Sequence, residues 1–87
     1  MTQDCIFCKI AAGQIPARLV YQDQHVTAFH DIDPKAPVHV LIIPNRHIES
    51  LAAVTGDDAE AVGRLLAVAG PIAQLTGVAA TGYRVTF

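Results

Sequence analysis

Two cysteines three positions apart, Cys5 and Cys8, stand near the start of the chain, and a histidine, His47, follows much later. A Cys-x-x-Cys pair with a distant histidine is a common set of zinc ligands, because Zn²⁺ prefers thiolates and imidazoles in tetrahedral geometry. Thiol redox chemistry is an alternative, although thioredoxin-type motifs follow a strand, for which residues 1–4 leave no room. Both cysteines could instead be buried as small apolar residues. The spacing alone leaves all three interpretations open.

A second cluster of residues that could carry chemistry lies around Asp31. Asp31 follows an apolar stretch that we expect to be the end of a strand. A short carboxylate at that place could accept hydrogen bonds from both hydroxyls of a ribose, while apolar neighbours sandwich a purine ring. The alternative is that Asp31 and Asp33 only form the turn before Pro34, as Asp-x-Asp-Pro commonly does. The apolar residues that could sandwich the ring beside Asp31 are Ile6, Phe7, Phe29 and Ile32.

The elements that must position these residues follow an α+β order. We expect a short helix over 5–12, with Asp4 as its N-cap and Gly13 as its stop. Residues 19–21 and 26–29 read as strands joined by a turn, and 38–43 as a strand buried on both faces. Thr55 and Asp58 form a capping box before the main helix, which Gly70-Pro71 should kink or end. Residues 82–87 alternate with period two, which predicts a last strand.

Composition narrows the function classes. A net charge of −2 gives no electrostatic footprint for nucleic acid or an anionic membrane. Apolar residues make up 52% of the 87 residues and charged residues only 16%, which argues against disorder. Residues 1–4 lack the features of a secretory signal, and no apolar run has the 18 or so residues of a membrane span. We therefore expect one domain over residues 1–87 in a cytoplasmic protein.

Residues 29–48, FHDIDPKAPVHVLIIPNRHI, resemble the signature region of the histidine triad (HIT) family, most closely its Hint-like members. The resemblance implies an antiparallel sheet with a short N-terminal helix and one long helix packed on it. It implies that Asp31 binds ribose hydroxyls of a purine nucleotide such as AMP. It also implies that His30 helps to line the base pocket with the apolar residues, and that His39 supports the active site. It also implies a homodimer, and structural zinc on Cys5, Cys8 and His47 with a fourth ligand beyond Phe87.

The family hydrolyses nucleoside phosphoramidates and related nucleotide conjugates through a nucleotidyl-histidine intermediate. Its nucleophile lies in a His-x-His-x-His segment, which does not occur among the 87 residues. We therefore expect a domain that is incomplete at its C-terminal end, with no catalytic residue and no activity of its own. Two alternatives are a non-catalytic zinc-knuckle interaction module and one half of a split enzyme, whose missing strand another chain supplies.

Overall fold

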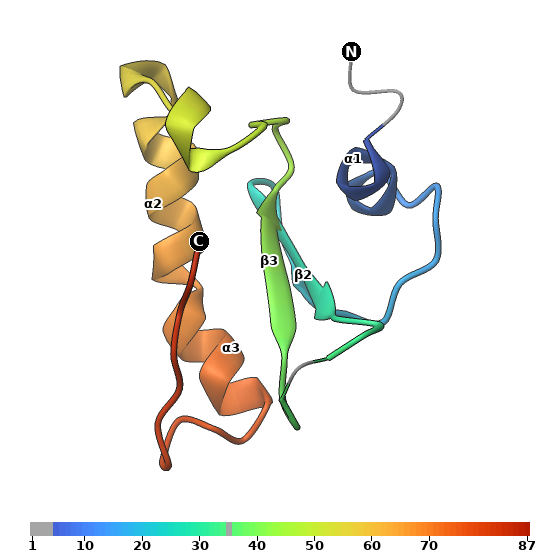
Figure 1. The fold of residues 1–87 in the computed structure, drawn as a ribbon, viewed down its shortest axis with the longest axis vertical. Coiled ribbons are helices and arrows are strands. Elements are labelled where there is room, and N and C mark those ends of the chain that lie inside the picture. Colours follow the sequence, from blue (N-terminus) through green and yellow to red (C-terminus); the bar gives the residue numbers. More distant parts are fainter. Residues whose placement is uncertain (1–4, 35) are drawn as a thin grey trace.

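The computed structural model describes residues 5–34 and 36–87, and it shows a small antiparallel sheet between helices (Figure 1). The sheet of the described residues has the order β1-β2-β3. Short 3₁₀ turns at Leu51–Ala53 and Gly56–Asp58 precede the second helix. The helices and strands are α1 (Ile6–Ala11), β1 (Leu19–Gln22), β2 (Val26–His30), β3 (Val40–Pro44), α2 (Ala59–Ala67) and α3 (Ala69–Leu75).

Helix α1 confirms the short helix expected near the start of the chain. Cys5 occupies the N-cap position, where its Sγ accepts a hydrogen bond from the Cys8 N–H at 3.4 Å. Gly13 has a φ of +78°, the left-handed conformation that glycine adopts most easily after a helix. Asp4, the expected N-cap, lies outside the described residues.

Strand β2 is the buried centre of the sheet. Its alternating side chains point to opposite faces, so Val26 and Ala28 share one face and Thr27 and Phe29 the other. Val26, Thr27 and Ala28 are fully buried, and Phe29 is 4% exposed. Val26 and Ala28 form the core with Val68 and Ile72 of the helical layer. Both faces of this strand are therefore covered.

The turn between β1 and β2 lies where the polar residues 23–25 predicted it. The Asp23 Oδ1 atom accepts hydrogen bonds from the N–H groups of His25 at 2.7 Å and Val26 at 2.9 Å. An aspartate that binds the backbone two and three residues ahead fixes a tight turn. The adjoining pairs Gln22–Thr27 and Tyr21–Ala28 then set the register of the hairpin.

The helical layer confirms the predicted cap and the predicted break. The Thr55 N–H donates to the Asp58 carboxylate at 3.0 Å, and a 3₁₀ turn leads from this capping box into α2. The helix is then divided at Val68, because Pro71 has no N–H for the carbonyl of Ala67. The single long helix of the sequence prediction is therefore two consecutive helices, α2 and α3.

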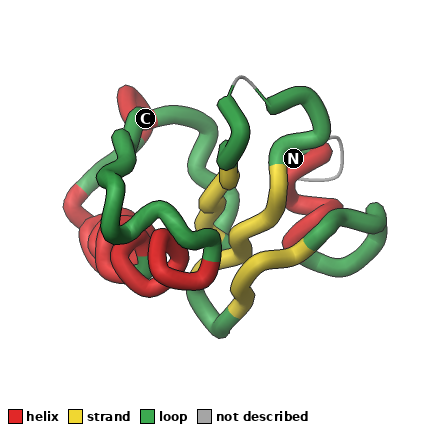
Figure 2. Tube along the Cα trace, turned by 90° about the horizontal axis from the view of Figure 1, so that it is seen from below, coloured by secondary structure: helices red, strands yellow, loops and turns green. Residues whose placement is uncertain are grey.

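Two strand predictions were wrong in part. Strand β3 forms, but all five of its residues are only half-buried, because β3 lies at an edge of the sheet and the doubly covered strand is β2. Residues 82–87 form no strand within the described part of the chain and are drawn as a loop in Figure 2. Their side chains are exposed. Alternation of residue types fixes faces, whereas a strand also needs a hydrogen-bonded neighbour, which this segment lacks.

Candidate functional site

Asp31 lies at the end of the ladder that joins β2 to β3. The last pair of that ladder is His30 with Val40. One step further, the Asp31 N–H donates to the His39 carbonyl oxygen at 3.0 Å. The loop between Asp31 and His39 is thus closed at its base by the backbone, and the two side chains face each other across it.

Both oxygens of the Asp31 carboxylate have partners in the protein. Oδ1 accepts a hydrogen bond from the Asp33 N–H at 3.0 Å, the turn geometry expected of Asp-x-Asp-Pro. Oδ2 lies 3.2 Å from the His39 Nδ1 atom. The Asp31 side chain remains 20% exposed, and each carboxylate oxygen has a second lone pair. The carboxylate is therefore oriented by the fold and still accessible to hydroxyl donors.

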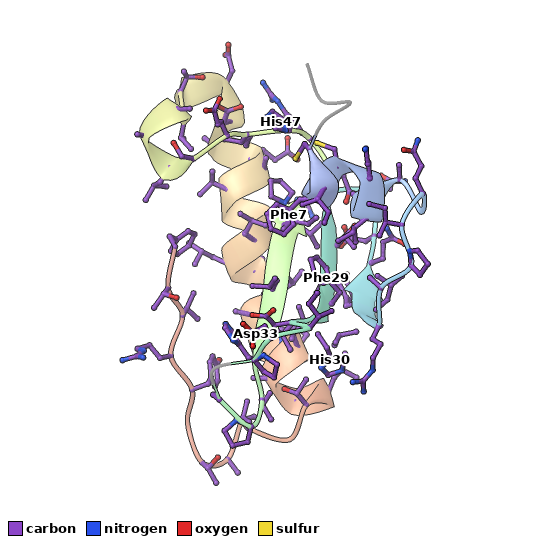
Figure 3. The ribbon with its side chains drawn as sticks, turned by 45° about the vertical axis from the view of Figure 1, so that its right-hand side comes forward. Phe7, Phe29, His30, Asp33 and His47 are labelled. Carbon is purple, nitrogen blue, oxygen red and sulfur yellow. The ribbon has the colours of Figure 1, made fainter. Side chains whose placement is uncertain are left out.

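The structure brings together two of the aromatic residues that were predicted to line a base pocket. Phe7 of α1 and Phe29 of β2 have ring centroids 6.3 Å apart and planes inclined by 35°. Figure 3 shows Phe7 between His47 and Phe29, with His30 at the far end of the same strand. Phe7 is 44% exposed, whereas Phe29 is buried beneath it. Phe7 thus offers an accessible ring, and Phe29 supports that ring from behind.

The remaining pocket candidates differ in position. His30 is half-buried at the end of β2. Ile6 is exposed beside Phe7 on α1. Ile32 is 98% exposed in the loop after Asp31, so in this conformation it does not join the two aromatic rings.

The three predicted metal ligands converge at the start of α1. One ligand atom from each of Cys5, Cys8 and His47 lies within 4.8 Å of the others. The Cys8 Sγ atom is 3.1 Å from the His47 Nδ1 atom, and Figure 3 shows His47 above Phe7 at this end of the molecule. Two sulfurs and one imidazole nitrogen are the donor set that suits Zn²⁺, with one tetrahedral position left for a further ligand.

The two thiols of this cluster differ in acidity. The hydrogen bond from the Cys8 N–H to its sulfur lowers the pKa of Cys5. Loss of hydration raises the pKa of Cys8, and the neighbouring Cys5 raises it further. Both cysteines are free thiols. Cys5 is therefore the more acidic of the two thiols, and a metal ion that binds both sulfurs would compete with protons most strongly at Cys8.

Sequence reasoning missed the residues that hold His47 in place. The Asn45 N–H donates to the His25 carbonyl at 2.9 Å, and the Asn45 Oδ1 accepts from the buried Thr27 hydroxyl at 2.6 Å. The Arg46 guanidinium lies 3.0 Å from the buried Asp58 carboxylate. The position of Asn45 and Arg46 directly before His47 could have indicated that they orient it. Their partners could not be predicted, because those residues are distant in sequence.

An apolar hollow of about 850 Å³ runs along the free side of β3. Its walls come from β3, the two helices and the segment 82–87, which lies beside α2 and α3 in Figure 1. We call it the β3-edge hollow. Representative lining residues are Val40, Ile42, Leu66, Ile72, Val85 and Phe87.

Comparison with known proteins places this geometry in a family. The family model described as "scavenger mRNA decapping enzyme C-term binding" matches residues 4–85. The purine nucleoside phosphoramidase of Escherichia coli K12 is 48% identical over 84 residues, which are 97% of this chain and 71% of that protein. Protein HitA of Neisseria gonorrhoeae is 43% identical over 75 residues, 86% of this chain and 70% of that protein.

Solved structures agree with these relatives. A HIT family hydrolase from Legionella pneumophila superposes with a TM-score of 0.91 at 46% identity, covering 97% of this chain and 75% of that one. A histidine triad protein from Clostridium difficile gives a TM-score of 0.92 at 43% identity, covering 97% of this chain and 73% of that one. The α+β fold expected from the sequence is thereby confirmed, and the chain belongs to the histidine triad (HIT) family.

Proposed function

We propose that this chain binds a purine nucleotide such as AMP, with Asp31 accepting the ribose hydroxyls and Phe7 contacting the base. The observation that carries the proposal is the carboxylate of Asp31, which is oriented by Asp33 and His39 and still accessible. Charged hydrogen-bond acceptors recognise paired hydroxyls strongly. Phe29, His30, Ile6 and Ile32 complete the proposed pocket, with Phe29 behind Phe7 and Ile32 exposed in the loop after Asp31.

The relatives indicate the chemistry to which such binding belongs. The E. coli protein at 48% identity is named a purine nucleoside phosphoramidase. We therefore propose purine nucleoside phosphoramidates, or related nucleotide conjugates, as the ligand class of this pocket. The 87 residues hold the walls for base and sugar, and we assign no nucleophile among them.

The test is calorimetric titration of AMP into the unaltered chain and into Asp31→Asn. Asparagine keeps the size of the side chain but removes the negative charge that attracts both hydroxyls. Because a hydrogen bond to a charged group contributes about 1.5–3 kcal/mol, we expect affinity to fall about 10- to 100-fold.

Asp57→Asn is the matched control, since Asp57 is an exposed acid that lines a different pocket, away from Asp31. It should bind AMP like the unaltered chain. Equal affinity in Asp31→Asn and Asp57→Asn would remove the ribose role from Asp31.

We also propose that Cys5, Cys8 and His47 bind structural zinc. Support comes from the three ligand atoms, which lie within 4.8 Å of one another, and from the two cysteines, which are free thiols.

Free thiols fit a reducing compartment, so we infer a cytoplasmic location. None of the helices in the described residues is long and apolar enough to cross a membrane.

A homodimer is part of the proposal. Leu66 and Leu75 expose 53% and 64% of their surface on the helices, and a second copy would cover such apolar side chains. Size-exclusion chromatography with light scattering reports the assembly directly.

A second candidate is one half of a split enzyme, in which another polypeptide supplies the phosphate-handling residues. The β3-edge hollow favours it, because the edge strand β3 and apolar residues of α2 and α3 line it together. Edge strands with unpaired groups are templates for a further strand.

A further inference from the structure

His39 contacts Asp31 in two independent ways. Its carbonyl oxygen accepts the Asp31 N–H at 3.0 Å, and its Nδ1 atom lies 3.2 Å from the Asp31 Oδ2. The first contact belongs to the backbone and survives any substitution of the side chain. The second belongs to the imidazole alone, so the two can be separated by mutation.

The imidazole decides where the second carboxylate oxygen points. Oδ1 is held by the Asp33 N–H at 3.0 Å, but one hydrogen bond leaves a carboxylate free to rotate about that anchor. The contact of Oδ2 with Nδ1 fixes the plane of the carboxylate. With 35% exposure for His39 and 20% for Asp31, this contact lies at the rim of the fold, not inside the core.

We propose that His39 is a positioning residue for ribose recognition: its imidazole holds the Asp31 carboxylate in the orientation that accepts two hydroxyls at once. The proposal rests on the ribose role of Asp31. By orienting the carboxylate in this way, His39 would make the site selective for nucleotides that have an intact 2′,3′-diol. His39 itself need not touch the ligand.

The geometry also predicts the state of the ring. An imidazole whose Nδ1 faces a carboxylate carries its proton on Nδ1, because that proton is the donor of the hydrogen bond. In the neutral ring of the unliganded chain, we therefore expect the Nδ1–H tautomer. Removal of the acceptor in Asp31→Ala should shift His39 toward the commoner Nε2–H tautomer.

The experiment compares AMP with 2′,3′-dideoxy-AMP in the unaltered chain, in Asp31→Asn, in His39→Phe and in His39→Gln. We expect the unaltered chain to prefer AMP by about tenfold or more, the size of one hydrogen bond to a charged group. His39→Phe should lose most of this preference while binding the dideoxy nucleotide as before. His39→Gln, whose amide can donate to Oδ2, should regain part of it.

The outcomes separate this inference from the proposed function. Loss of diol preference in Asp31→Asn, but not in His39→Phe, would overturn the role of His39 and leave that of Asp31. Absence of diol preference in the unaltered chain would overturn both. His25→Gln is the control, since His25 lies in the β1–β2 turn, and it should keep the full preference.

The ring state gives a second measurement that needs no ligand. Long-range ¹H–¹⁵N spectra of the imidazoles distinguish the two tautomers, and the shift of His39 on Asp31→Ala substitution tests the contact directly. A His39 ring with its proton on Nε2 in the unaltered chain would overturn the proposal, even if His39→Phe proved too unstable to titrate.

Discussion

Two aspartates of this chain have different roles: Asp23 stabilises a turn, whereas Asp31 is the candidate for ligand binding. The Asp23 carboxylate accepts from the backbone of His25 and Val26 and from the Tyr21 hydroxyl at 2.7 Å. These bonds lower the pKa of Asp23 from 3.8 to about 2, the hydroxyl of Tyr21 most strongly. Asp31 has one backbone donor and one imidazole, which leaves acceptor capacity for a ligand.

Asp23 should therefore give the protein an acid-sensitive component of stability. Its pKa is lower in the folded chain than in the unfolded chain, so its contribution is complete above pH about 4. That contribution is lost as the pH falls from about 4 toward 2, since the unfolded state then binds the proton first. Urea unfolding between pH 6 and pH 2 should show a shallower acid dependence for Asp23→Asn than for the unaltered chain.

Asp57→Asn is again the matched control and should keep the full acid dependence. If Asp23→Asn and the unaltered chain lost stability in parallel down to pH 2, the turn would not depend on the ionised carboxylate. The hydrogen bond that the Tyr21 hydroxyl donates to Asp23 also raises the pKa of Tyr21, because it holds the proton that Tyr21 would lose.

For single residues, the sequence predicted where the turns lie better than it predicted which side chains contact each other across the sheet. The turn at Asp23 and the turn at Asp31 both follow from local hydrogen bonding, which short polar side chains do within two or three residues. The contact between Asp31 and His39 depends on the register of two strands. No local pattern encodes that register, so His39 was expected near the site without a defined partner.

At the scale of elements, the thiol–imidazole cluster ties α1 to the segment that follows β3. Cys5 and Cys8 belong to the first turn of α1, while His47 is held beyond β3 by its neighbours Asn45 and Arg46. Helix α1 has only six residues and no buried residue of its own. Short isolated helices are marginal in water, so this helix depends on what anchors it.

Zinc binding should accordingly stabilise α1 in particular. Elemental analysis after purification without chelator should give about one zinc per chain, and Cys8→Ser should lower this value sharply. Removal of the metal should lower the melting temperature, by about 4–8 °C for each kcal/mol of lost binding energy in a domain of this size. Hydrogen exchange should then become faster in α1 first.

His25→Gln serves as the histidine control here too, because His25 lies outside the cluster. It should retain the metal. A chain purified without zinc, or one whose zinc content is unchanged by Cys8→Ser, would exclude these three residues as ligands.

The helices were more predictable than the strands because their signals are local. The Thr55–Asp58 box, Pro71 and Gly13 act on their own turn of the chain, and each marks a boundary in the structure. Which strand becomes central depends on the order of strands in the sheet. The apolar run at 38–43 therefore predicted a strand correctly. It did not predict the burial, because β2 is the strand covered on both faces and β3 is only half-buried.

At the scale of the whole molecule, the chain forms layers around β2. Phe7 of α1 covers the Phe29 side of that strand, and α3 covers the side of Val26 and Ala28 through Ile72. Figure 1 shows α1 on one side of the sheet and α2 on the other. The layers close over β2 but not over β3, whose free side faces the β3-edge hollow.

The β3-edge hollow leads to a prediction about complementation by a second polypeptide. We expect the 87-residue chain alone to show no turnover of adenosine phosphoramidate above a buffer control. We expect turnover when it is mixed with a second polypeptide, namely the part of the E. coli phosphoramidase that this chain does not match. A strand that pairs with β3 would bury apolar surface against Leu66, Ile72 and Val85, and it would hold the second polypeptide next to the proposed nucleotide pocket.

Val85→Asp tests whether the second polypeptide enters the hollow, because it places a charge on one rim. It should abolish the complemented activity while leaving AMP binding intact. Leu51→Asp, an equally drastic change at an exposed leucine outside the hollow, should leave both unchanged. Turnover by the chain alone, with contaminating full-length enzyme excluded, would contradict the split-enzyme candidate, and so would complementation that Val85→Asp does not reduce.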